Sequence, residues 1–247
     1  MSLVEAGLIV LAGLGAGTIN AVVGSGSLIT FPTLVWVGLP PVVANVSNTV
    51  GLVPGAAAGA WGYRRELAGQ RGRLMRLGVG TLIGSVVGAI LLLVLPPGVF
   101  ATVVPALILL ACVLVVIQPW LVRRLADRPR REHGGPLVWL AIFATGMYGG
   151  YFGAAQGVLL IAVLAVGLDE TLQRVNAAKN VLGGLANLVA GALFIVVADV
   201  NWAAAGLVAA GAVVGGLLGA RVARRLAPAA LRAVVVLIGI IAVVTLV

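Results

Sequence analysis

The chain has 247 residues, of which 62% are hydrophobic and 9% are charged, and its net charge is +9. Soluble domains contain about 45–50% apolar and about 25% charged residues, so this chain has too little polar surface to be water-soluble. Most of its basic residues fall in three clusters, at 64–76, 123–131 and 221–232. Such clusters indicate cytoplasmic loops of a membrane protein rather than a nucleic-acid surface.

Ten apolar segments follow one another along the chain. They run approximately over 6–23, 28–39, 42–62, 77–95, 99–122, 136–152, 157–168, 175–198, 202–220 and 230–247. The second and seventh would be roughly 18 Å long as helices, whereas the hydrocarbon core is about 30 Å thick, so neither can span it alone. Glycine-rich breaks precede both. We therefore expect an all-α polytopic protein of about eight to ten transmembrane segments, with broken or re-entrant helices after Gly24 and Gly153.

The breaks predict where a transport pathway lies. Non-helical backbone inside a membrane is tolerated only where it is buried in protein or lines a wet cavity, because lipid cannot form hydrogen bonds with it. Three polar residues lie in the breaks, namely Ser25, Ser27 and Gln156, and Asn20 lies shortly before the first break. For Tyr148 and Tyr151, which flank the second break, packing is the favoured interpretation.

The chain also repeats itself. Gly17, Gly24 and Gly38 recur 129 residues later as Gly146, Gly153 and Gly167, and Asn48, Gly51 and Gly59 recur after 132 residues as Asn180, Gly183 and Gly191. The series Gly80, Gly84 and Gly88 recurs after 131 residues as Gly211, Gly215 and Gly219, and we interpret both series as helix-packing surfaces. This order predicts two homologous halves, over 1–122 and 136–247, joined by a basic cytoplasmic linker over 123–135.

Charge predicts that the two halves are inverted. The arginines at 64–76 have no basic counterpart in the matching stretch of the second half, which contains Asp199. Equivalent loops then face opposite sides of the membrane, and both termini are extracytoplasmic. Inverted repeats are typical of secondary transporters, whose substrate sites lie at the repeat interface near the membrane midplane.

The chemistry of a soluble enzyme is not evident in the sequence. The only histidine, His133, lies in a loop, and none of the seven acidic residues lies in the middle of an apolar segment. We therefore expect no catalytic residues, no metal site and no cofactor.

Lys179 is the exception among the charged residues, because it lies about one turn inside an apolar segment. A membrane-embedded lysine costs about 2.5–3.5 kcal/mol on insertion scales unless it reaches the interface or a partner, which makes it a candidate for function. We favour a role as charge partner of an anion. The alternative is that it reaches the cytoplasmic face together with Arg174.

Amides and hydroxyls surround Lys179 and its counterpart in the first half, Ser47. They are Asn176 and Asn180 in the second half and Asn45, Ser47, Asn48 and Thr49 in the first. Helix N-termini carry about half a positive charge and free N–H donors, so two such starts with one ammonium suit an anion. Alternatively, Asn45, Ser47 and Asn48 cap a helix start and form hydrogen bonds between helices.

These motifs resemble the TauE/SafE sulfite exporter family over nearly the whole chain. The resemblance is carried by the blocks at 17–26, 31–32, 37–41 and 44–49 in the first half, and by 146–157, 166–168 and 176–180 in the second. It implies a prokaryotic cytoplasmic-membrane transporter of small anions such as sulfite, thiosulfate, sulfonates and other organic acids.

We therefore expect a secondary transporter that carries a small, sulfur-containing anion across the membrane by alternating access. An anion channel, or a transporter of organic anions without sulfur, is the main alternative. The expected partners are the lipid bilayer and the anionic substrate. A proton or a sodium ion as coupling ion, and a homodimer, are compatible with the sequence.

Overall fold

The computed structural model describes residues 1–125, 135–222 and 228–246, with side chains left undescribed at 121–134, 222–230 and 245–247. The predicted linker at 123–135 and much of the basic cluster at 221–232 therefore lie outside the described residues. Ten helices occur in the described part: α1 (Leu3–Val22), α2 (Ser27–Trp36), α3 (Pro41–Gly62), α4 (Arg71–Val94), α5 (Pro97–Leu125), α6 (Pro136–Tyr151), α7 (Gln156–Gly167), α8 (Leu172–Val197), α9 (Trp202–Val222) and α10 (Pro228–Leu246). They correspond to the ten predicted apolar segments.

Five of these helices, α1, α4, α5, α8 and α9, are long and apolar enough to cross a membrane by length and composition. Many large apolar side chains on them are exposed, including Val196 at 82% and Val94 at 76%. Such surface suits lipid rather than water. The prediction of an all-helical, polytopic membrane protein is therefore confirmed.

The short helices α2 and α7 each follow a sharp reversal of the chain. Gly24 (φ 91°) and Gly153 (φ 76°) have left-handed backbone conformations, which favour glycine. Each glycine donates its N–H to the carbonyl five residues earlier, Gly24 to Ile19 and Gly153 to Tyr148. This closure ends α1 and α6, and α2 and α7 then pack back against them as two helical hairpins.

The tips of these hairpins touch each other. The Gly157 N–H donates to the Gly24 carbonyl at 2.9 Å. A Cβ atom at Gly24 would lie only 2.5 Å from the Gly157 Cα, so the close approach requires glycine at this position. Beside the tips, Phe31 of α2 packs edge-on against Phe152, with ring centroids 5.2 Å apart. The two hairpins thus meet as one packed unit.

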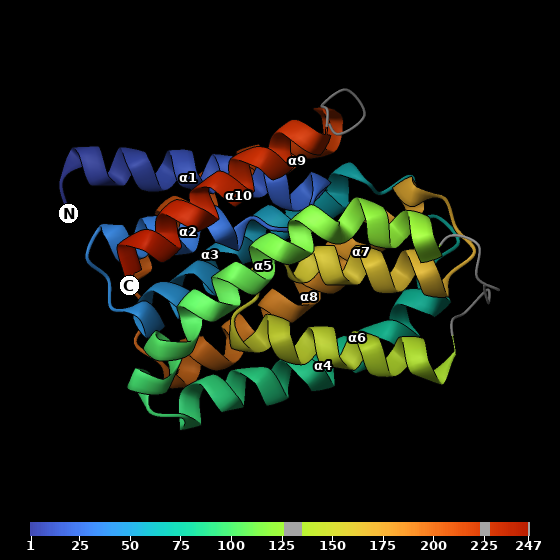
Figure 1. Cartoon of the computed structure of the whole chain (residues 1–247), viewed down its shortest axis with the longest axis horizontal. Helices are drawn as coiled ribbons and strands as arrows, with labels where there is room; N and C mark the ends of the chain where they lie inside the picture. The colour runs from blue at the N-terminus through green and yellow to red at the C-terminus, as the bar shows by residue number, and fades with distance from the viewer. Residues whose placement is uncertain (126–134, 223–227, 247) are drawn as a thin grey trace.

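Outside the hairpins, the helices pack mainly in pairs. Helix α1 lies along α9 and α4 lies along α6, while α3 and α8 cross between them and α5 packs against α10 (Figure 1). The predicted glycine series form these contacts: Gly80, Gly84 and Gly88 of α4 meet Trp139, Phe143 and Met147 of α6, and Gly211, Gly215 and Gly219 of α9 meet Val10, Leu14 and Thr18 of α1. Their predicted role in helix packing is confirmed.

The two chain termini lie at the same end of the molecule, on the left in Figure 1. The connections α3–α4 and α7–α8 lie at the opposite end (Figure 1), where the Arg174 guanidinium donates to the Ala68 carbonyl at 3.0 Å. The arginines of the first basic cluster, at 64–76, accordingly lie at the end away from the termini.

Candidate functional site

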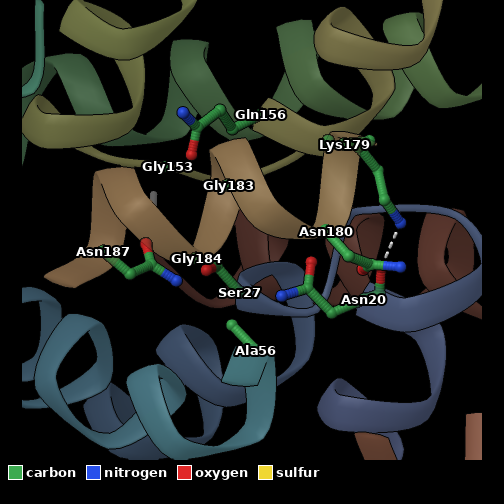
Figure 2. Close-up of a pocket in the computed structure, with 11 residues that line it drawn as sticks. Asn20, Ser27, Ala56, Gly153, Gln156, Lys179, Asn180, Gly183, Gly184 and Asn187 are labelled. Atoms are coloured by element: carbon green, nitrogen blue, oxygen red, sulfur yellow. Dashed lines mark hydrogen bonds between the residues drawn. The ribbon is translucent and has the colours of Figure 1, made fainter. Parts of the chain in front are cut away.

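A small polar cavity lies where the two hairpin tips meet (Figure 2). Its volume is about 20 Å³, and it is lined by Asn20, Ser27, Ala56, Gly153, Gln156, Gly157, Lys179, Asn180, Gly183, Gly184 and Asn187. A water molecule needs about 10–15 Å³ of such space. The cavity therefore has room for a single water and is too small, in this conformation, for an oxyanion of four heavy atoms.

Lys179 of α8 contributes the charge of the cavity. Its side chain is buried, and its ammonium donates to the carbonyls of Asn20 at 2.6 Å and Ala21 at 3.2 Å. These carbonyls belong to the last turn of α1, where a helix has free acceptors and about half a negative charge. The ammonium thus points into the protein, at the end of α1, and not toward the surface of the molecule.

Two helix N-termini face the same cavity. Helix α2 begins at Ser27 and α7 begins at Gln156, and both residues line the cavity with Gly157. The first N–H groups of a helix have no partners within it, and the macrodipole adds about half a positive charge there. Gln156 is also buried, and its Nε2 atom has no hydrogen-bond partner among the described residues. Most of the first N–H groups of both helices are taken by carbonyls at the tips: Gln156 donates to Gly153, Gly157 to Gly24, and Leu28 to Ser25. The starts of the short helices therefore contribute their dipoles and the Gln156 side-chain amide to the cavity.

A second set of amides holds the walls in place. Asn48 donates to the Ser27 hydroxyl at 3.2 Å and accepts a hydrogen bond from Thr30, so it orients Ser27. Asn176 donates to the Ala21 carbonyl at 3.1 Å, and Asn180 donates to the same carbonyl at 3.3 Å. Together with Lys179, these donors occupy the negative end of α1.

Of the eleven predicted site residues, five line the cavity: Asn20, Ser27, Gln156, Lys179 and Asn180. The other six lie elsewhere, and Asn48 and Asn176 support the walls as described.

The remaining four predicted residues lie in helix contacts or at the tip. Asn45 donates to the Tyr151 carbonyl at 3.0 Å, Ser47 accepts from the Asn201 N–H at 2.9 Å, and Thr49 donates to a carbonyl of its own helix. For Asn45 and Ser47, these contacts match the alternative of hydrogen bonding between helices. Ser25 is buried in the first tip beside the cavity, without lining it.

Sequence reasoning missed one polar lining residue, Asn187, and three small ones, Ala56, Gly183 and Gly184. A signal for three of them was present. Asn180, Gly183, Gly184 and Asn187 recur at i, i+3, i+4 and i+7, which places them on one face of α8. That face is unusually small and polar for an apolar segment, and the cavity lies against it.

An ion-pair cluster lies at the end of the bundle away from the termini. Glu170 accepts from Arg73 of α4 at 2.9 Å and from Arg174 of α8 at 2.5 Å. Burial raises the pKa of the Glu170 carboxyl, but hydrogen bonds and charge from Arg174 and Arg73 outweigh burial and hold that pKa below its usual range. Gln70 adds a hydrogen bond to the Arg174 carbonyl at 3.1 Å. The cluster joins the start of α4 to the start of α8.

Apolar helices around two opposed hairpins with a buried polar cavity at their tips are the architecture of a membrane transport protein. Comparison with known proteins agrees. The family described as "Sulfite exporter TauE/SafE" matches residues 9–246, so the chain belongs to this family of membrane transporters.

Curated relatives carry transporter names as well. A "Probable membrane transporter protein" of Haemophilus influenzae is 26% identical over 211 residues, covering 85% of this chain and 81% of the relative. The "Probable membrane transporter protein YfcA" of Escherichia coli K12 is 28% identical over 212 residues, covering 85% and 76%. A "Probable membrane transporter protein ORF9" of Sinorhizobium is 22% identical, covering 84% and 79%. No solved structure matches the chain.

Proposed function

We propose that the protein is a secondary transporter that moves a small anion, namely sulfite, thiosulfate or an organosulfonate, through the cavity at the hairpin tips. The observation that carries this proposal is the convergence of the buried Lys179 ammonium and the N-termini of α2 and α7 on one polar cavity. The ammonium favours negative charge, and the positive ends of the α2 and α7 dipoles orient an anion beside it. The carbonyl end of α1, which would repel an anion, is occupied by donors from Lys179, Asn176 and Asn180.

An inverted repeat is the second part of the proposal. If α1 to α5 correspond to α6 to α10, then the α1 and α9 pair corresponds to the α6 and α4 pair, and both pairs pack closely. The α3 and α8 contact and the α5 and α10 contact each map onto themselves. The polar contacts are similar in the two halves, although each is displaced by one residue: Asn45 donates to a carbonyl at the end of α6, and Asn176 donates to one at the end of α1. A pseudo-two-fold axis through the tips would account for the helix pairings.

The size of the cavity supports alternating access over a permanently open pore. A cavity of about 20 Å³ cannot conduct an oxyanion without rearrangement. In a carrier, one half rocks against the other and opens the site to one side at a time. We propose that the two hairpins, which enter from opposite ends of the bundle, are the moving parts.

The test is transport by the purified, full-length protein in proteoliposomes. Efflux of preloaded sulfite should be accelerated by sulfite on the opposite side, because exchange through a carrier bypasses the slow return of the empty site. Imposed proton and sodium gradients, applied separately, identify the coupling ion. A flux that scales with the driving force and is not accelerated by sulfite on the opposite side would establish the channel instead. Exchange with carboxylates but with no sulfur anion would establish a transporter of other organic anions.

A further inference from the structure

The cavity presents a single charged side chain to its contents. Among the eleven lining residues, Lys179 alone is ionisable, and the others are amides, one hydroxyl, glycines and an alanine. The elements packed around it contribute Asn20 from α1, Ser27 from α2, Ala56 from α3 and Gln156 from α7, none of which titrates. Among the described acidic residues, Glu5, Glu66, Asp169, Glu170 and Asp199 all lie outside the lining.

The helix ends at the tips add little to this net charge. Each tip joins the C-terminal end of one helix to the N-terminal end of the next, α1 to α2 and α6 to α7. The two ends carry about half a charge each, with opposite signs. Their contributions therefore offset each other to first order. They orient an anion between donors, but the ammonium sets the net charge of the site at about +1.

The Lys179 ammonium is buried, and one buried cation balances one negative charge far better than two, because an uncompensated charge away from water loses its hydration without gaining a partner. Resting on the proposed function, we propose that the protein binds its substrate as a monoanion: hydrogen sulfite, or a sulfonate whose single charge is spread over three oxygens. Dianions such as thiosulfate and fully deprotonated sulfite are then poor substrates unless a cation enters with them.

The neutral lining suits such an ion. The side-chain amides of Asn180, Asn187 and Gln156 can donate N–H groups to sulfonyl oxygens. Their carbonyl oxygens can accept the hydroxyl proton of hydrogen sulfite, whereas the same oxygens would repel a second negative charge. Gln156 has the clearest vacancy for this purpose, because its buried Nε2 has no partner among the described residues. The Gln156 amide packs against Gly149, which has no Cβ atom to displace it.

The test compares methanesulfonate with sulfite in binding to the purified protein across neutral pH, at constant ionic strength. Methanesulfonate keeps one charge throughout, so its affinity reports only on the protein, including any titration of Lys179. Total sulfite changes from mostly monoanion to mostly dianion over the same range. We expect the ratio of the apparent sulfite Kd to the methanesulfonate Kd to rise by about tenfold per pH unit once the dianion dominates, because only the remaining monoanion binds.

A flat ratio, or thiosulfate binding as tightly as methanesulfonate without a required cation, would overturn the monoanion proposal while leaving anion transport intact. Failure of every sulfur anion to bind at any pH would instead overturn the proposed function. A variant offers a second test: Gln156→Lys places another cation at the cavity and should raise thiosulfate affinity relative to methanesulfonate by at least about tenfold. Gln156→Met, which is similar in size and uncharged, is the matched control and should not favour thiosulfate.

Discussion

Lys179 shows how one side chain can serve two partners. Its ammonium compensates the carbonyl end of α1 in the closed conformation, at Asn20 and Ala21, and it also lines the cavity in which we place the anion. A lysine suits this exchange better than arginine, because its compact charge on a flexible stem can shift between acceptors. Substrate binding and the position of the first hairpin are then linked through the same nitrogen atom of Lys179.

Replacing this lysine should weaken the anion site. We expect Lys179→Gln to reduce binding by at least about 1.5–3 kcal/mol, which is the strength of a hydrogen bond to a charged group and more than tenfold in Kd. Lys179→Arg should not restore it, because a planar fork cannot replace a point charge at the end of α1. Isothermal titration with methanesulfonate measures both.

Arg174 is unsuitable as the charge control for this experiment, since it belongs to the ion-pair cluster around Glu170. The exposed Arg71 is the better choice. Arg71→Gln should leave the Kd unchanged. If Lys179→Gln bound and transported the anion like the wild type, the helix N-termini and amides alone would form the site.

At the scale of single elements, the hairpin tips depend on glycine for two separate reasons. Gly24 has a positive φ and lies against the backbone of Gly157, whereas Gly38 has a similar φ of 96° but nothing near its missing Cβ. We expect Gly24→Ala to abolish transport, because the new Cβ forces the tips apart. Gly38→Ala shares the conformational cost of about 1–2 kcal/mol and should retain transport. Equal loss in both variants would mean that the tip contact is unimportant.

The glycine series along α4 has a packing role, so its substitution should affect folding. A Cβ at Gly84 would collide with the Phe143 carbonyl of α6, while Gly206 in α9 has open space around it. We expect Gly84→Ala to lower the Tm by several degrees and Gly206→Ala to leave it within experimental error. Thermal unfolding in detergent, followed by size-exclusion fluorescence, measures the difference. An unchanged Tm for Gly84→Ala would remove close α4 and α6 packing as a source of stability.

The cluster around Glu170 predicts a pH dependence of stability. Its carboxyl has a lower pKa in the folded protein than in the unfolded chain, so the ion pairs stabilise the fold above the unfolded pKa, and that contribution is lost as the pH falls through the folded-state pKa. Glu170→Gln should therefore destabilise the protein near neutral pH by about 1.5–3 kcal/mol. The difference from wild type should shrink below about pH 4.3. A constant difference at all pH values would exclude the ion pairs as its cause.

The elements were predictable from the sequence to a degree that the site was not. Apolar segment length and the breaks at Gly24 and Gly153 predicted the ten helices and the two short ones, because helix length and left-handed glycine are local properties. The partners of Asn45 and Ser47 depend on how distant helices cross, which no local pattern contains. Asn187 is a different case: its spacing from Asn180, Gly183 and Gly184 was visible in the sequence, but which face of α8 borders a cavity depends on the helices that pack around it.

The orientation of the molecule in the membrane can be tested directly. The termini lie at one end, and the arginines of the α3–α4 connection lie at the other. Since basic loops remain in the cytoplasm, we expect Leu3→Cys and Gly98→Cys to react with a membrane-impermeant maleimide in intact cells. Arg65→Cys should react only after permeabilisation. Cys112, which is buried, is first replaced by alanine to remove background. The reverse labelling pattern would show that the termini lie in the cytoplasm.

The hydrogen bond between Gly157 and Gly24 has a consequence for the proton gradient across the membrane. The tips are in contact, and the space beside them has room for about one water molecule. If the protein is the carrier that we propose, this contact has to break before an ion can pass. We therefore expect an idle copy of the protein to add little to the proton leak of the membrane.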